Sequence, residues 1–437
     1  MRSAESMANN KLTTNLNGKF ALTLAIGLAI CSLGGCQQPD PKPAPAPTVR
    51  TKLPLLNGPD GKPIIRVLLT PSAINSADLS AGRGFKIVAD QKIRTSPAAG
   101  PAPGSTIRRS GGLWFAGAAS FKAPRLIVAP TDNRSGRYVG FGSKTYRGTL
   151  HLIPKGPAGF IVINYVNFDD YLAGVLAREL FGSWHIEAYR SLAVAARTFA
   201  LHHMLHNKRS REYDVDDTVS SQVYGGLGAE TQKSRHAVDS TAGWTLTVKL
   251  AGKNRIFMPQ YSSCCGGWVN AAIVLRDAPA IAPLAGGQKD LHCTASKRYR
   301  WAPVRVSKAE LFARLSQYHP SVAALGSIST IQVTQQLTHG RPVWVNIIGP
   351  GRKSVRLRAE KIRLALIFSK SPAGKKLYSM NCQIVDVGNA IEFRNGRGFG
   401  HGVGMCQYGL QGKAMAGWKA SRIISFYYPG ADIVKLY

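Results

Sequence analysis

Apolar and polar residues follow two different periods along this chain. In the first part, short runs rich in β-branched and apolar residues alternate with polar stretches, the pattern of β-strands. A Pro- and Gly-rich patch at residues 95–105 is typical of a loop. The predicted strands occupy residues 64–70, 113–115, 125–128, 150–153 and 160–163.

From residue 169 the period changes to that of a helix. Apolar residues recur every three or four positions, and a second, Ala-rich helix is predicted from residue 186 to about 205. We expect Asp169 or Asp170 to cap the first helix and Ser183 to cap the second. One face of the first helix carries Leu172, Val175, Leu176 and Glu179.

The rest of the chain returns to short strands, from Trp244 and from Arg341, with a helical segment at residues 308–318 between them. A regular strand–helix–strand rhythm is missing, which argues against a doubly wound sheet. We therefore predict an α+β fold, with short strand clusters around a central helical pair that carries the candidate catalytic glutamate, Glu179.

The N-terminus resembles an export signal. Lys11 and Lys19 precede an apolar run at residues 20–30 that is short for a membrane span. The sequence LGGC, ending at Cys36, resembles the lipobox of bacterial lipoproteins, so residues 1–36 are interpreted as a signal peptide and Cys36 as a lipidation site. An ordinary signal peptide with a chance cysteine is the alternative. Residues 37–63 form a Pro-rich linker, and residues 64–437 form the folded domain.

The charge is strongly unbalanced. Lys and Arg number 56 against 23 Asp and Glu, a formal net charge of +33. Such a surface attracts polyanions, among them nucleic acids, anionic lipids and acidic cell-wall polymers. With a membrane tether outside the cytoplasm, we expect a lipid-anchored protein that faces the cell wall or periplasm, and no specific nucleic-acid partner.

Glu179 lies where the helical pattern predicts an apolar side chain. A partly desolvated carboxyl group has a raised pKa, and can then hold a proton and donate it as a general acid. Alternatively, Glu179 is at a frayed helix end and reaches water. On the second helix, Arg197 is flanked by alanines, and its guanidinium is suited either to hold a substrate, to orient Glu179 or to be solvated.

Four stretches, in order, resemble the stage II sporulation protein D family (SpoIID/LytB). The resemblance runs from about residue 64 to the C-terminus, with signature helices at about 166–205 and a Gly-His-Gly block at 396–418. The chain departs from the family pattern at Arg178, Leu180 and Phe181, and has Cys406 where the pattern has Ser. The matching stretches are VNFDDYLAGVLARELFGSWHIEAYRSLAVAARTFAL, YDVDDTVSSQVYGG, YSSCCGGW and GRGFGHGVGMCQYGLQGKAMAGW.

The resemblance implies a bacterial cell-wall protein. Sporulation members of the family are lytic transglycosylases that cut peptidoglycan glycan strands, and their catalytic glutamate corresponds to Glu179. One carboxyl group suffices because the sugar's own primary hydroxyl is the nucleophile, closing an anhydro-muramic ring. Such a reaction needs no cofactor. Other relatives are amidase enhancers, which stimulate a partner amidase.

The glycine-rich loop at residues 396–409 holds a single histidine. We expect its glycines to let the backbone approach a sugar chain, with polar side chains available to hydroxyl and N-acetyl oxygens. For Gln222 and Tyr408, bracing of the loops is the alternative. The candidate substrate-binding residues are Arg197, Gln222, Tyr224, His401, Gln407 and Tyr408.

Five cysteines follow the lipobox, so an odd thiol remains if the others pair. The favoured interpretation is a disulfide from Cys265 or Cys264 to Cys293, as exported proteins permit. A structural zinc site formed by Cys265, His292 and Cys293 is the alternative.

Overall fold

The computed structural model describes residues 57–58, 61–80, 85–89, 92–93, 105–131, 138–206, 211–277 and 281–437. The predicted signal peptide, the lipobox with Cys36, most of the linker and nearly all of the predicted loop at 95–105 lie outside these residues. Within the described ranges, no helix combines the length and apolar character needed to cross a membrane.

Two β-sheets come first along the chain, and their strands include all five predicted ones. Leu68 of β1 pairs with Ile163 of β12, and the antiparallel register continues to Ile64 and Asn167. The first sheet has the order β13 (Val215–Asp216), β1 (Ile64–Leu68), β12 (Gly159–Asn167), β11 (Thr149–Lys155), β8 (Leu126–Pro130), β3 (Phe85–Ala89) and β4 (Lys92–Ile93). The second has the order β10 (Lys144–Tyr146), β9 (Val139–Phe141), β2 (Ser76–Ser80), β5 (Ser105–Ser110), β6 (Leu113–Ala116) and β7 (Ala119–Phe121).

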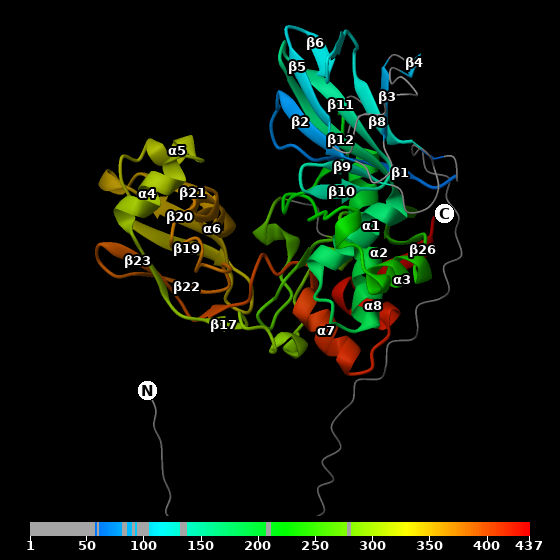
Figure 1. Ribbon diagram of the computed structural model, residues 1–437. Coiled ribbons are helices and arrows are strands. Elements are labelled where there is room, and N and C mark those ends of the chain that lie inside the picture. The colour runs from blue at the N-terminus through cyan, green and yellow to red at the C-terminus, as the bar shows by residue number, and fades with distance from the viewer. Residues whose placement is uncertain are drawn as a thin grey trace, which may run out of the picture. The chain divides into compact units, whose positions relative to one another are not determined.

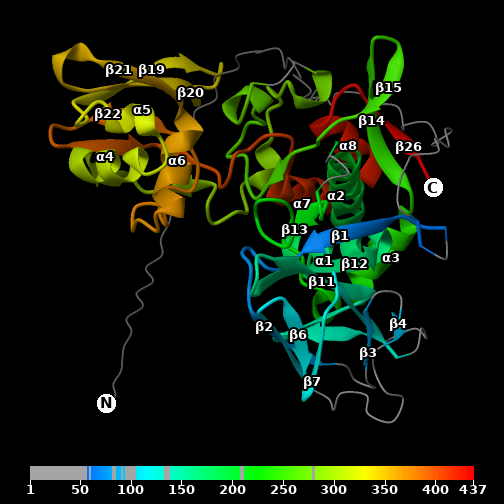
Figure 2. The same ribbon diagram turned by 90° about the horizontal axis from the view of Figure 1, so that it is seen from above.

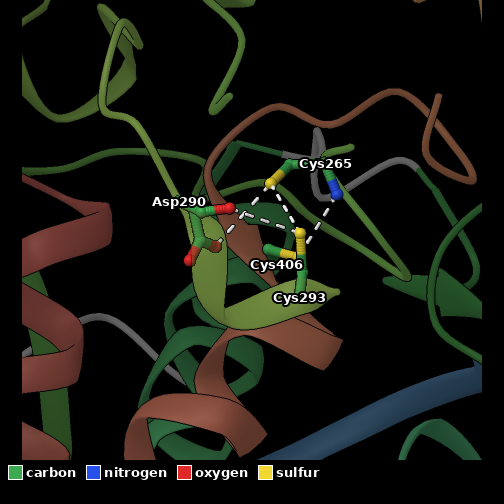
Figure 3. A group of neighbouring side chains, drawn as sticks. All are labelled: Cys265, Asp290, Cys293 and Cys406. Carbon is green, nitrogen blue, oxygen red and sulfur yellow. Dashed lines mark hydrogen bonds between the residues drawn. The ribbon is translucent and has the colours of Figure 1, made fainter. Parts of the chain in front are cut away.

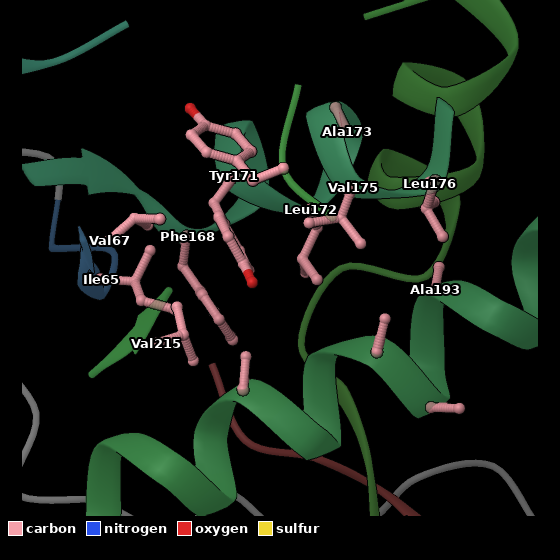
Figure 4. Packing of buried hydrophobic residues seen from close by; sticks show 14 of the residues in the cluster. Ile65, Val67, Phe168, Tyr171, Leu172, Ala173, Val175, Leu176, Ala193 and Val215 are labelled. Carbon is pink, nitrogen blue, oxygen red and sulfur yellow. The ribbon is translucent and has the colours of Figure 1, made fainter. Parts of the chain in front are cut away.

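The two predicted helices, α1 (Phe168–Glu179) and α2 (Ile186–His206), follow β12 directly. Helix α1 packs against β1 and β12, as both ribbon views show (Figure 1, Figure 2). In Figure 4, Leu172 and Leu176 lie on the side of α1 that faces Ala193 of α2. All three are fully buried, so the helical pair forms much of the main core.

Several further elements complete this part of the molecule. Helix α2 contacts α3, α7, α8 and β14, so residues from the C-terminus pack around the helix that the Ala-rich segment forms. The helices are α3 (Gln232–Ser240), α7 (Gln407–Met415) and α8 (Ala420–Tyr427). The strands pair as β15 (Lys253–Ile256), β14 (Trp244–Leu250) and β26 (Ala431–Lys435); β16 (Tyr261–Ser262) with β25 (Met405–Cys406); and β17 (Arg300–Trp301) with β24 (Gly396–Arg397). Single 3₁₀ turns are η1 (Leu227–Ala229), η2 (Ala272–Val274), η3 (Ala282–Leu284), η4 (Leu291–Cys293) and η5 (Pro350–Arg352).

Residues 304–394 build a second hydrophobic core of their own, in which Leu311, Ile347 and Phe393 are fully buried. The predicted helix and strand of this region are present. Its helices are α4 (Lys308–Ser316), α5 (Pro320–Ala323) and α6 (Ala359–Phe368). One of its sheets has the order β18 (Val304–Ser307), β23 (Ala390–Arg394) and β22 (Gln383–Asp386). The other has the order β19 (Thr330–Gln336), β20 (Pro342–Ile348) and β21 (Ser354–Arg358). The architecture is α+β, as predicted.

Both predicted N-caps of the helical pair are wrong. Helix α1 begins at Phe168, so Asn167 is the cap, and its side-chain oxygen accepts from the Asp169 N–H at 3.0 Å. Helix α2 begins at Ile186, and the ring Nδ1 of His185 accepts from the Glu187 N–H at 3.1 Å. The predicted caps therefore lie one to three residues from the observed helix starts, within the range over which sequence signals leave a helix boundary open.

Replacing Asn167 with Ala should lower the free energy of unfolding by about 1 kcal/mol, because the amide of Asp169 loses its acceptor. Asn167→Asp retains an acceptor and should leave most of that stability. Urea unfolding of the three proteins measures the difference. Equal stability of the Ala and Asp variants would contradict the role of Asn167 as cap.

Candidate functional site

Glu179 is the last residue of α1, and its half-buried side chain is held by two donors from distant segments. Gln407 Nε2 donates to Glu179 Oε2 at 2.8 Å, and the backbone N–H of Val223 donates to Oε1 at 3.4 Å. Both oxygens of the carboxyl group are therefore fixed in direction. Gln407 is the first residue of α7, and Val223 lies in the segment that follows β13, so these two segments meet at Glu179.

Burial raises the pKa of Glu179, and this effect exceeds the opposing effects of the hydrogen bonds from Gln407 and Val223. Among the described residues, no second carboxylate contributes to this shift. Glu179 thus has the raised pKa that a general acid needs, and the groups that shift this pKa include no other carboxylate.

The loop between α1 and α2, which directly follows Glu179, carries two aromatic side chains that contact a third on α7. Phe181 is 58% exposed. Its ring contacts Trp184 edge-on at 5.3 Å between centroids, and Trp184 contacts Tyr408 at 5.1 Å. We call these three residues the aromatic cluster. Rings of this kind present apolar faces on which a sugar can pack.

Other contacts hold this loop rigidly. Lys233 Nζ donates to the carbonyls of Gly182 at 2.6 Å and Trp184 at 2.8 Å. The N–H of His185 donates to Gln411 Oε1 of α7 at 2.8 Å. Because the loop is bound to both α3 and α7, the aromatic cluster keeps a fixed place relative to Glu179.

The glycine-rich loop leads into α7 through β25, which pairs in parallel with β16. Gly402 has φ +67°, and a Cβ there would meet Asn270 Nδ2 at 2.1 Å; Gly404 has the same φ, and its Cβ would meet the Gln260 carbonyl oxygen at 2.1 Å. The glycines therefore accommodate the chain's own residues 260–270. For Gly402 and Gly404 the requirement therefore comes from the chain itself, and the approach of the loop to a sugar chain stays a prediction.

Comparison with known proteins identifies the family of this chain. Residues 158–248, which include Glu179 and Val223, match the family model described as Stage II sporulation protein, and residues 237–404 match a domain of unknown function. An uncharacterized protein of Brachyspira hyodysenteriae is 33% identical over 290 residues, covering 66% of this chain and 72% of that protein. The chain belongs to the stage II sporulation protein D family.

Two further proteins that this chain resembles have names that state a role. The Stage II sporulation protein D of Bacillus subtilis is 28% identical over 306 residues, which cover 67% of this chain and 81% of that protein. The Amidase enhancer of Bacillus subtilis is 26% identical over 346 residues, which cover 70% of this chain and 46% of that protein.

The structure brings two of the predicted binding residues to the Glu179 site. Gln407 contacts the carboxyl group itself, and Tyr408 joins the aromatic cluster. Gln222 lies behind the site, fully buried: it accepts from Tyr171 Oη at 3.0 Å and donates to Tyr261 Oη at 2.9 Å. Gln222 therefore braces the loops, the alternative left open from the sequence.

Tyr224 and His401 have internal contacts instead. The buried Tyr224 ring packs on Tyr171, and its hydroxyl donates to Asn164 Oδ1 at 3.1 Å. His401 Nδ1 accepts from the Val403 N–H at 3.0 Å, and burial lowers the pKa of His401 to about 4. His401 is thus neutral at pH 7 and stabilises its own loop.

Arg197 does not face the site, contrary to its predicted role in substrate binding. It is fully buried, and its guanidinium donates to Tyr437 Oη at 3.0 Å and to the carbonyls of Val238 and Trp244 at 3.3 Å. Asp169, at 3.5 Å, balances its charge. Arg197 therefore joins α2 to the C-terminal residues.

The cysteines also differ from the favoured prediction. Cys265 Sγ and Cys293 Sγ are 3.6 Å apart, whereas a disulfide requires about 2.05 Å, and Cys264 is also unpaired with any described cysteine. The predicted disulfide is absent. His292 lies outside the thiol group, and its ring Nδ1 is 3.4 Å from Lys413 Nζ.

Sequence reasoning missed Trp184, Val223 and the exposed Phe181. An aromatic pair in the polar segment directly after the candidate glutamate was a usable signal for two of them. Val223 contributes a backbone N–H, which no side-chain pattern reveals.

Arg197→Ala should lower the free energy of unfolding by about 3–5 kcal/mol, because Asp169 then loses the buried cation that balances it. The matched control Arg178→Ala, at an exposed position on α1, should change it by less than about 0.5 kcal/mol. Chemical denaturation measures both. Similar losses in the two variants would show that burial of Arg197 is not what stabilises the helical pair.

The raised pKa of Glu179 predicts a pH-dependent stability difference. The folded protein holds the Glu179 proton more tightly than the unfolded chain, so this contribution is present at low pH and is lost as pH rises through the folded pKa. Relative to wild type, Glu179→Gln should therefore gain stability from pH 4 to pH 8. Asp239→Asn, which removes a carboxylate at an exposed position on α3, is the matched control. A Glu179→Gln advantage that shrinks with rising pH would mean that the pKa is lowered.

Proposed function

We propose that this protein is a lytic transglycosylase that cleaves peptidoglycan glycan strands with Glu179 as its single acid and base. The observation that carries this proposal is the carboxyl group of Glu179, which has a raised pKa, is oriented by Gln407 and Val223, and directly precedes the loop that carries Phe181 and Trp184 of the aromatic cluster. Membership of the stage II sporulation protein D family supports a role at the cell wall.

The mechanism needs one carboxyl group because the substrate supplies the nucleophile. Neutral Glu179 donates its proton to the glycosidic oxygen as the bond from that oxygen to the muramic C1 breaks. The resulting carboxylate then accepts the proton of the muramic C6 hydroxyl, whose oxygen bonds to C1 and closes the anhydro ring. Glu179 ends protonated, and no water is consumed.

Gln407 and the aromatic cluster have separate roles in this mechanism. The hydrogen bond from Gln407 holds the carboxyl group in place and stabilises its ionised form between the two proton transfers. The exposed face of Phe181 and the ring of Tyr408 pack on sugar rings next to the cleaved bond. The net charge of +33 favours binding to the acidic polymers of the cell wall.

The proposed location of the protein rests on the sequence of its N-terminal segment. We propose that the chain is exported and anchored to a bacterial membrane through lipidated Cys36, with the Pro-rich linker holding the folded domain at the wall. Peptidoglycan glycan is then the substrate within reach.

The proposed reaction is tested with purified protein and isolated glycan strands. Wild type should produce fragments that end in anhydro-muramic acid, detected by mass spectrometry. Glu179→Gln should lower the rate by about a hundredfold to ten-thousandfold while strand binding persists, because the amide has no proton to cycle. Asp239→Asn is the matched control and should keep full activity. Anhydro products at an equal rate from Glu179→Gln would overturn the assignment.

The second candidate function is enhancement of a partner amidase, favoured by the similarity to the Amidase enhancer of Bacillus subtilis. An enhancer yields no anhydro ends from glycan strands, even those without stem peptides. It accelerates release of stem peptides by an added N-acetylmuramoyl-L-alanine amidase, and Glu179→Gln leaves that acceleration intact. The two assays together separate the two functions.

A further inference from the structure

Four potential metal ligands from three distant segments meet in the core of the molecule. They are the thiols of Cys265, Cys293 and Cys406 and the carboxylate of Asp290. All four residues are buried, and their ligand atoms lie within 4.8 Å of one another. In Figure 3 the three sulfur atoms and the carboxylate point toward a common centre. We call these residues the thiol cluster.

The spacing of the thiol cluster suits a metal ion better than a covalent bond. Cys265 Sγ and Cys293 Sγ are 3.6 Å apart. Tetrahedral zinc with ligands at about 2.3 Å places neighbouring sulfur atoms about 3.8 Å apart, close to this separation. A disulfide would need the two atoms to approach to about 2.05 Å.

Two backbone N–H groups point at Cys406 Sγ. The N–H of Cys265 donates to this sulfur at 3.2 Å, and the N–H of Gly409 donates at 3.3 Å. The second contact makes Cys406 the N-cap of α7, so the positive end of the helix dipole faces the sulfur. A thiolate is the form of cysteine that binds a metal.

Asp290 is oriented by buried partners beyond the cluster. Lys413 Nζ donates to its Oδ1 at 2.5 Å, and Tyr427 Oη donates to its Oδ2 at 2.6 Å. Both partners are fully buried. Outer contacts of this kind fix a ligating carboxylate. With a divalent ion, three thiolates, Asp290 and Lys413, the whole assembly carries a single negative charge.

We propose that Cys265, Cys293, Cys406 and Asp290 bind one zinc ion in a closed, structural site. Thiolates select soft or borderline metals, and a buried set of four ligands that leaves no position for water is typical of structural zinc. The ligand set differs from the sequence expectation, since Asp290 and Cys406 replace His292. Binding releases the thiol protons and involves no change in oxidation state.

Such a site would hold the end of the glycine-rich loop in place. It joins the segment after β16, the 3₁₀ turn η4 and the first residue before α7. Cys406 directly precedes Gln407, which donates to Glu179. Zinc would therefore fix the backbone from which Gln407 reaches the candidate acid, whichever of the two candidate functions the protein performs.

The test uses full-length protein, without a histidine tag, purified in the absence of chelators and reductants. Elemental analysis and native mass spectrometry should find one zinc per chain. Cys406→Ser keeps the helix cap, and Ser is the residue of the family pattern, so the variant should fold; it should bind zinc more than about a hundredfold more weakly. Cys382→Ser removes a buried cysteine of the second core, and should keep one zinc per chain.

Cobalt exchange gives an independent measurement on the wild-type protein. Co²⁺ in the site should show thiolate-to-metal charge-transfer absorption, which should weaken in Cys265→Ser as one thiolate is lost. Circular dichroism verifies that the variants are folded. Metal-free protein with a Cys265–Cys293 disulfide would overturn the proposal. So would full zinc retention by folded Cys406→Ser, or zinc loss from folded Cys382→Ser.

Discussion

The hydrogen bond from Gln407 to Glu179 is the contact on which the arrangement of the candidate site depends. It joins the end of α1 to the start of α7, across 228 positions of sequence. For this contact to form, β25 must pair with β16, and Gly402 and Gly404 must take positive φ so that the loop passes close to Asn270 and Gln260. The cost in backbone entropy of a glycine-rich loop is thus offset by a fixed position for one amide group.

The same contact explains why Glu179 is suited to acid chemistry although it accepts two hydrogen bonds. Donors stabilise a carboxylate and lower its pKa, while burial raises it, and burial prevails here. The neutral side-chain amide of Gln407 and the backbone N–H of Val223 orient the carboxyl group without supplying a full positive charge. A Lys or Arg in the place of Gln407 would orient it as well, but would hold it ionised and remove its proton at neutral pH.

Periodicity was sufficient for much of the fold. The apolar runs predicted five strands of the first two sheets, and the helical stripe that ends in Glu179 predicted α1. The sequence left two interpretations of Glu179 open, a desolvated carboxyl group or a residue at a helix end that reaches water. The structure combines parts of both, because Glu179 is the last residue of α1 and its side chain is half-buried. What the pattern could not show was which distant segments meet. Alanines next to Arg197 suggested room for a ligand, yet its guanidinium is buried in contact with Tyr437 and Asp169.

Three consecutive residues at the junction of β25 and α7 make contacts with three different groups. Cys406 faces the thiol cluster, Gln407 reaches Glu179, and Tyr408 packs on Trp184. A continuing strand would send alternate residues to two opposite faces, and a regular helix would separate neighbours by about 100°. The backbone is extended at Cys406 and helical from Gln407. This change lets the three neighbouring side chains leave the chain in three directions. A displacement of this junction would therefore move the thiol ligand, the contact to the candidate acid and one ring of the aromatic cluster together, which makes the junction the natural place for a rigid structural site.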